Sequence, residues 1–138
     1  MKIKNITIVG TLNILNSFAD KKLPQKISYA ITRNLMLFQK EYQYYEVEMK
    51  KLEAKYDGSF VHTEKGEITR DQKGIPVLST NQEQEAYNQE LYELLNIEID
   101  IPVYYIDSEE FNYDNDAGRY DIMSASDILT LQSVLCDN

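Results

Sequence analysis

Four side chains near the start of the chain have the types and spacing needed to bind an anion: Lys22, Lys26, Tyr29 and Arg33. Lys26, Tyr29 and Arg33 are three and four residues apart, which places them on one face of a helix. A helix that begins after Pro24 would put the lysines at its N-terminus, where free N–H groups and the helix dipole attract negative charge. Tyrosine can stack on a base, and arginine can form a forked contact with phosphate. These residues predict a pocket for a nucleotide-derived anion.

The uneven distribution of charge gives a second interpretation of the same cations. The net charge is −9, but residues 1–56 hold ten basic and five acidic side chains, and residues 57–138 hold four and eighteen. Segments of opposite charge attract each other within one fold or between subunits. The cations would then pair with the acidic half instead of a ligand. Direct binding to nucleic acid is not expected, because the overall field repels phosphate.

Residue types that carry catalysis do not form a complete set. His62 and Glu64 match the first half of a zinc-deaminase motif, but that chemistry needs two cysteine ligands and the chain has only Cys136. His62 is the only histidine, so it is expected to be exposed to solvent. The five glycines are scattered and predict no phosphate-binding loop.

An acidic segment resembles a calcium-binding loop in part. Asn112, Asp114 and Asp116 alternate as in such a loop, but Ala117 stands where the glycine is required and Met123 stands where the bidentate acid is required. No metal site, catalytic residue or cofactor is therefore predicted, and the protein is not expected to be an enzyme.

The longest predicted element is a helix that runs from Pro24 to Tyr56 without a glycine or an internal proline. Its apolar residues recur at alternating spacings of four and three, which is a heptad pattern and predicts a seam covered by other helices. Such a long seam favours a homo-oligomer, with a homodimer as the simplest case. Gly58 is expected to end the helix in a left-handed cap. The seam consists of Ile31, Leu35, Phe38, Tyr42, Tyr45, Met49, Leu52 and Tyr56.

Shorter elements complete a single domain, 1–138, of the α+β class, mostly helical. The long helix is expected to form an antiparallel helical hairpin with a later helix, beside a small β-sheet or lobe. No internal repeat and no membrane-spanning segment is expected. In chain order, the other predicted elements are a strand at 2–8, a helix at 10–19, a hairpin or mobile lobe at 59–78, a helix at 80–95 capped by Thr80, a strand at 96–106, and a last helix capped by Ser124.

The motif Lys22-Leu23-Pro24, with Lys26 and Ser28-Tyr29, is followed by a long charged helix and by the segments 90–95 and 97–101. In this order the chain resembles a family of small phage-encoded proteins of unassigned function. The resemblance spans most of the chain. It implies a viral protein that acts in the host cytoplasm, often as an accessory or anti-defence factor, and it supplies no catalytic residues.

These observations lead to one expected function and two alternatives. The first is a phage accessory binding protein that counters host defence by sequestering a nucleotide-derived immune signal at Lys22, Lys26, Tyr29 and Arg33. The alternatives are an acidic DNA mimic that inhibits a host nuclease, and a phage tail or assembly protein. The expected partners are a second copy, an anionic nucleotide or a host defence protein, with no direct nucleic acid and no membrane.

Overall fold

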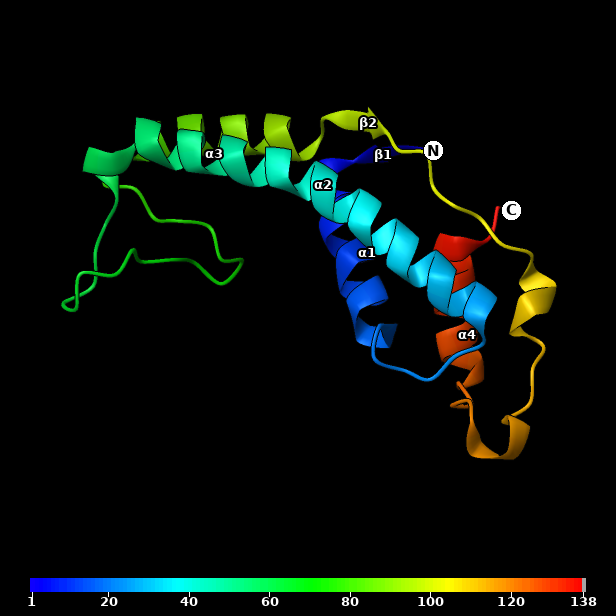
Figure 1. Ribbon diagram of the computed structural model, residues 1–138. Coiled ribbons are helices and arrows are strands. Elements are labelled where there is room, and N and C mark those ends of the chain that lie inside the picture. Colours follow the sequence, from blue (N-terminus) through cyan, green and yellow to red (C-terminus); the bar gives the residue numbers. More distant parts are fainter. Residues whose placement is uncertain (138) are drawn as a thin grey trace. The chain divides into compact units, whose positions relative to one another are not determined.

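A computed structural model describes residues 1–137 of the chain (Figure 1). It confirms the mostly helical α+β class. Two short strands pair antiparallel, with Ile3 opposite Ile99. The helices and strands are β1 (Lys2–Lys4), α1 (Asn5–Phe18), α2 (Gln25–Lys55), α3 (Asn81–Leu95), β2 (Glu98–Asp100) and α4 (Ala125–Leu135).

The predicted strand at the N-terminus is correct only for its first residues. β1 ends at Lys4, and α1 begins at once with Asn5. Ile8, Leu12 and Leu15 are buried at helical spacing, so packing of this face decides the conformation. A few alternating residues are too short a signal to fix a period of two.

The second predicted strand is also shorter than expected. β2 covers only Glu98–Asp100, and Ile101 continues the pairing by donating its N–H to the carbonyl oxygen of Met1 at 2.9 Å. Pro102 follows and has no N–H to donate, which removes a ladder hydrogen bond. The pairing of this segment with the N-terminal strand is confirmed.

α2 is one helix over 31 residues, as its sequence predicts. The carbonyl oxygen of Pro24 accepts from the N–H of Ser28 at 3.0 Å, which starts the helical hydrogen bonds. The predicted left-handed cap at Gly58 is wrong. Gly58 lies in a 3₁₀ turn, Asp57–Ser59, and is not among the residues with positive φ. The chain therefore leaves α2 by tightening its last turn.

The chain forms two compact units, and α2 contributes to both. Unit 1 comprises Met1–Gln43 and the residues from Glu98 onward, and unit 2 comprises Tyr44–Ile97. The core of unit 1 is made by α1, the first part of α2, α4 and the segment between β2 and α4. Its largest fully buried apolar side chains are Phe38, Ile8, Leu15, Ile27, Ile101, Leu131 and Leu135.

Unit 2 is built on the predicted antiparallel hairpin of α2 and α3. Thr80 caps α3, since its hydroxyl accepts from the N–H of Glu83 at 3.2 Å. Figure 1 shows α3 running beside the end of α2, with residues 59–79 leaving as a separate lobe. The core of unit 2 consists of Leu52, Phe60, Leu78, Tyr87 and Leu91.

Side chains of the same chain cover the predicted seam of α2. Ile31, Phe38 and Leu52 are buried, and the other seam residues are half-buried. The first half of the seam contributes to the core of unit 1, and the second half to that of unit 2. The homo-oligomer stays a prediction.

The lobe contains a short structural repeat, so the prediction of no internal repeat is wrong for this segment. Val61 donates its N–H to the carbonyl of Val77, Val77 donates to Thr69, and Thr69 donates to Val61, at 2.8–2.9 Å. The three residues are eight positions apart, and their hydrogen bonds close a ring. A second set of three bonds has the same spacing: Thr63 to Glu67, Asp71 to Ile75, and Ser79 to Ser59.

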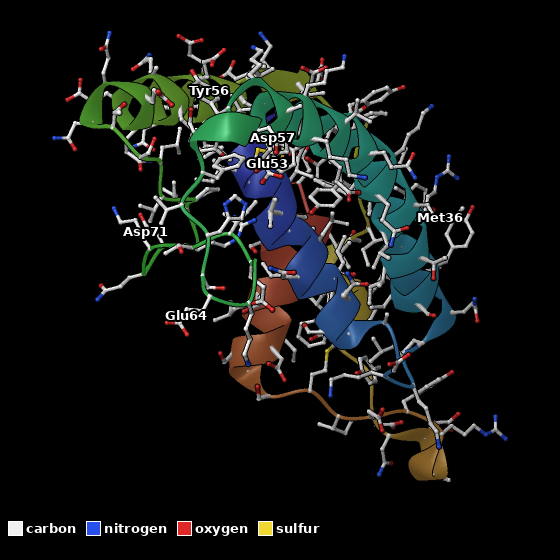
Figure 2. The ribbon with its side chains drawn as sticks, turned by 90° about the vertical axis from the view of Figure 1, so that its left-hand side faces the viewer. Met36, Glu53, Tyr56, Asp57, Glu64 and Asp71 are labelled. Carbon is white, nitrogen blue, oxygen red and sulfur yellow. The ribbon has the colours of Figure 1, made fainter. Side chains whose placement is uncertain are left out.

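Two similar turns join the three segments of this ring. Lys65-Gly66 and Lys73-Gly74 are also eight residues apart, and both glycines have positive φ, 82° and 80°. The Asp71 carboxylate accepts from the N–H groups of Lys73 and Ile75 and so fixes the second turn. Figure 2 shows Glu64 and Asp71 on this lobe. After the third segment, the chain does not form another such turn but continues into α3.

Within residues 1–137, no helix combines the length and the apolar content that crossing a bilayer requires.

Candidate functional site

Three of the four predicted ligand-binding residues lie on one exposed face of α2, in unit 1. Lys26, Tyr29 and Arg33 follow one another at the predicted helical spacing. Tyr29 is 48% exposed, so its ring is open to solvent although its residue type favours burial. Lys22 precedes the helix and is exposed. The structure therefore brings together the tyrosine and the arginine, with Lys26 one turn away.

Arg33 lies beside two aromatic rings that contact each other. Its Nη1 donates to the Tyr29 hydroxyl at 3.0 Å, and its guanidinium carbon is 6.0 Å from the centre of the Tyr29 ring. The same carbon is 5.0 Å from the centre of the Tyr104 ring. The two rings meet edge to face, with centroids 5.5 Å apart. Cation–π attraction holds the guanidinium over Tyr104.

Tyr104 is held in place by a buried amide, that of Asn34. Asn34 Nδ2 donates to the Tyr104 carbonyl at 2.8 Å, and Asn34 Oδ1 accepts from the Tyr104 N–H at 2.8 Å. Asn34 is 0% exposed and lies on the buried side of α2. A buried amide with both groups satisfied fixes its partner firmly. These two hydrogen bonds therefore fix the position of Tyr104 along the length of α2.

The two lysines are partly engaged with the acidic half of the chain. Lys26 Nζ forms an ion pair with Glu110 Oε1 at 3.1 Å. The Lys22 backbone N–H donates to the Asp121 carboxylate at 2.8 Å, and its carbonyl accepts from the Asp121 N–H at 2.7 Å. The second interpretation of the cations, in which they pair with the acidic half of the chain, therefore holds for Lys26.

Arg33 differs from Lys26 in having no carboxylate partner. Within residues 1–137, no acidic side chain comes within ion-pair distance of its guanidinium. One of the guanidinium N–H groups is bonded to Tyr29, and arginine carries five. The cation is oriented by two rings and keeps donors for an anion. This arrangement can hold a planar group against an aromatic face and a phosphate against the guanidinium.

Two residues of this site, Asn34 and Tyr104, were missed by the sequence analysis. Asn34 carried a signal, because it is a polar residue on the face of α2 that otherwise presents Ile27, Ile31 and Phe38 to the core. A polar residue in such a position needs a buried partner. Tyr104 carried none, since 70 residues separate it from Asn34.

The acidic segment forms its own turns and no metal cluster. The carboxylates of Asp107 and Asp114 accept backbone N–H groups two residues ahead, at 3.0 and 2.8 Å. Ala117, in the position where a calcium loop requires glycine, has φ 58°. In residues 1–137 no three histidine, cysteine or acidic side chains are grouped so that they could hold a metal ion. His62 is exposed, as expected.

Comparison with known proteins finds no protein-family model, no curated protein and no solved structure that matches this chain.

Proposed function

We propose that the protein is a binding protein that holds a planar anionic ligand of the nucleotide class at Tyr29, Arg33 and Tyr104. The observation that carries the proposal is the guanidinium of Arg33, held over the Tyr104 ring and without a carboxylate partner in residues 1–137. Lys26 would contribute once the ligand competes with Glu110. The site is an exposed face, so a ligand reaches it without any opening of the fold.

A virus-encoded protein of this kind would act by removing a nucleotide-derived immune signal from the host. The resemblance to small phage proteins supports this role. The acidic DNA mimic and the tail or assembly protein are the alternatives.

The proposal is tested by calorimetry with cyclic nucleotides, ADP-ribose, adenosine and pyrophosphate as separate titrants. Saturable binding is expected for a compound with both base and phosphate, and weaker binding for adenosine or pyrophosphate alone. Arg33→Ala, or the pair Lys26→Ala and Arg33→Ala, is expected to weaken binding at least about tenfold. Arg119→Ala is the matched control, because Arg119 is an exposed arginine of the same unit paired with Asp116 at 3.6 Å.

Variants of Tyr104 separate stacking from hydrogen bonding. Tyr104→Phe keeps the ring and is expected to keep the affinity, whereas Tyr104→Leu is expected to lose it. Absence of binding for every titrant would refute the proposal, and capture of a host nuclease by the same protein would favour the DNA mimic.

A further inference from the structure

The helical hairpin of unit 2 has one covered side and one open side. On the covered side, Phe60 and Leu78 of the lobe pack against Leu52, Tyr87 and Leu91. On the other side, an open groove of about 530 Å³ runs between α2 and α3. Leu94 and Ile97 form its accessible apolar part, since Leu52 also lines it but is buried in the core of unit 2. A two-helix layer with one bare side is half of a four-helix bundle.

The apolar surface continues beyond the groove along α2. Tyr44 and Val47 lie one helical turn before Glu48 and Lys51, on the same side of the helix. Tyr44 is 61% exposed, and Val47 and Ile97 are each 51% exposed. Exposed apolar residues that lie on the same side of a helix as a groove mark an interaction surface more than scattered ones do.

The two walls of the groove have opposite charge, which decides between possible occupants. The α2 wall presents Lys51 and Lys55, and the α3 wall presents Glu90 and Glu93, with Glu48 as the one acid on the α2 side. Within the subunit, Lys51 pairs with Glu48 at 3.1 Å and Lys55 pairs with Glu90 across the groove at 2.8 Å, so part of the charge on each wall is already balanced. A partner of one charge would be attracted by one wall and repelled by the other. A second copy related by a two-fold axis along the groove presents α3 to α2 and α2 to α3, so each wall meets its opposite.

We propose that this groove is the interface of a symmetric homodimer, in which two α2–α3 hairpins pack face to face as an antiparallel four-helix bundle. The proposal does not depend on the ligand site, which lies in unit 1. It assigns the self-association predicted from the long helix to the groove, whereas the seam of α2 packs mainly within the subunit.

Sedimentation velocity of the full chain tests the proposal, with a dimer expected at high micromolar concentration. The double variant Val47→Glu and Ile97→Glu is expected to raise the dimer dissociation constant about 100-fold, because it puts carboxylates into an apolar contact. The matched control is Ile122→Glu with Leu129→Glu, two aliphatic residues of unit 1 that are 63% and 67% exposed. The control is expected to dimerise like the wild type.

A charge-exchange experiment tests the symmetry and does not rely on the apolar variants. Lys51→Glu and Glu93→Lys are each expected to dimerise more weakly than the wild type, since each puts like charges opposite one another. An equimolar mixture of the two is expected to recover a heterodimer, because every 51–93 contact then joins opposite charges. Circular dichroism checks that each variant keeps its helices.

Three results would overturn the proposal. They are a monomer at every concentration, a dimer unaffected by the groove variants, and failure of the mixed charge variants to associate better than either alone. A groove that binds a helix of another protein while the chain stays monomeric would count against it in the same way.

Discussion

The two units of this molecule are stabilised in different ways. Among residues 1–137, seventeen are buried in the largely aliphatic core of unit 1, whereas five are buried in that of unit 2. Unit 2 has polar contacts around its smaller core. The Glu90 carboxylate accepts from Lys55 and from the Tyr56 hydroxyl, both at 2.8 Å, and Arg70 of the lobe lies 3.7 Å from Glu53. Figure 2 shows Glu53 and Tyr56 near the end of α2.

The difference indicates that the units depend on different conditions. Apolar burial contributes about 25 cal/mol per Å² and involves no titrating group, so the larger core makes the stability of unit 1 less dependent on pH. Exposed ion pairs contribute little each and are screened by salt. Unit 2 is therefore expected to open at lower free energy than unit 1, which hydrogen exchange would detect.

The largest effect is expected from truncating a large buried side chain in the core of unit 1. Phe38→Ala should lower the free energy of unfolding by about 3–5 kcal/mol, since Phe38 is fully buried and its loss leaves a cavity. Urea denaturation followed by circular dichroism measures this. Met36→Ala is the control on the same helix, because Met36 is 66% exposed, and it should change stability by less than about 0.5 kcal/mol. If both variants unfolded alike, the core assignment would be wrong.

The next largest effect is expected at the amide that positions the candidate site. Asn34→Ala leaves the Tyr104 N–H and carbonyl without their partner, at a cost of about 2–4 kcal/mol for the two groups. Amide exchange at Tyr104 should accelerate more than that of the neighbouring buried amides. Ligand affinity should also fall, although Asn34 itself is buried away from the exposed face. A stable variant with an unchanged Tyr104 amide would contradict this role.

A smaller and pH-dependent effect is expected at Glu90 in unit 2. Hydrogen bonds from Lys55 and Tyr56 lower the pKa of Glu90 from its ordinary value of 4.5. A carboxylate with a lowered folded pKa stabilises the fold above its unfolded pKa, and this stability is lost as the pH falls through the folded pKa. Glu90→Gln should destabilise by at most about 1 kcal/mol at neutral pH.

The comparison of Glu90→Gln with the wild type across pH is the informative measurement. The difference between the two proteins should shrink on acidification below about pH 4.5 and vanish once Glu90 is protonated. Urea midpoints at several pH values measure it. A difference that grew in acid would show that the carboxylate is not stabilised as described.

The smallest effect is expected from removing the hydroxyl of Tyr87. This oxygen is buried and has no hydrogen-bond partner within residues 1–137, and burial raises the pKa of Tyr87 to about 12. Tyr87→Phe should leave the free energy of unfolding unchanged or raise it by up to about 1 kcal/mol. Tyr56→Phe is the control and should destabilise, because it loses the bond to Glu90. Thermal denaturation of both variants checks the order.

The helical hairpin could largely be predicted from sequence, because its two helices carry local signals. Pro24 and the unbroken heptad pattern give the bounds of α2, and Thr80 marks the start of α3. The contacts that define the candidate site could not be predicted. The Tyr104–Asn34 pair and the Arg33–Tyr104 stack join segments far apart in sequence, and nothing local specifies which residue of an irregular segment meets a helix.

Closure of the lobe sets the number of its segments. In an open repeat array, each unit contacts only its neighbours and further units can be added at the end. In the lobe, Val61, Thr69 and Val77 each donate an N–H to the carbonyl of another of the three, so all of these N–H and carbonyl groups already have partners. Insertion of another eight residues would leave one donor and one acceptor unmatched. A fourth segment would therefore require this ring to open, whereas changes at the two turn tips would leave it closed.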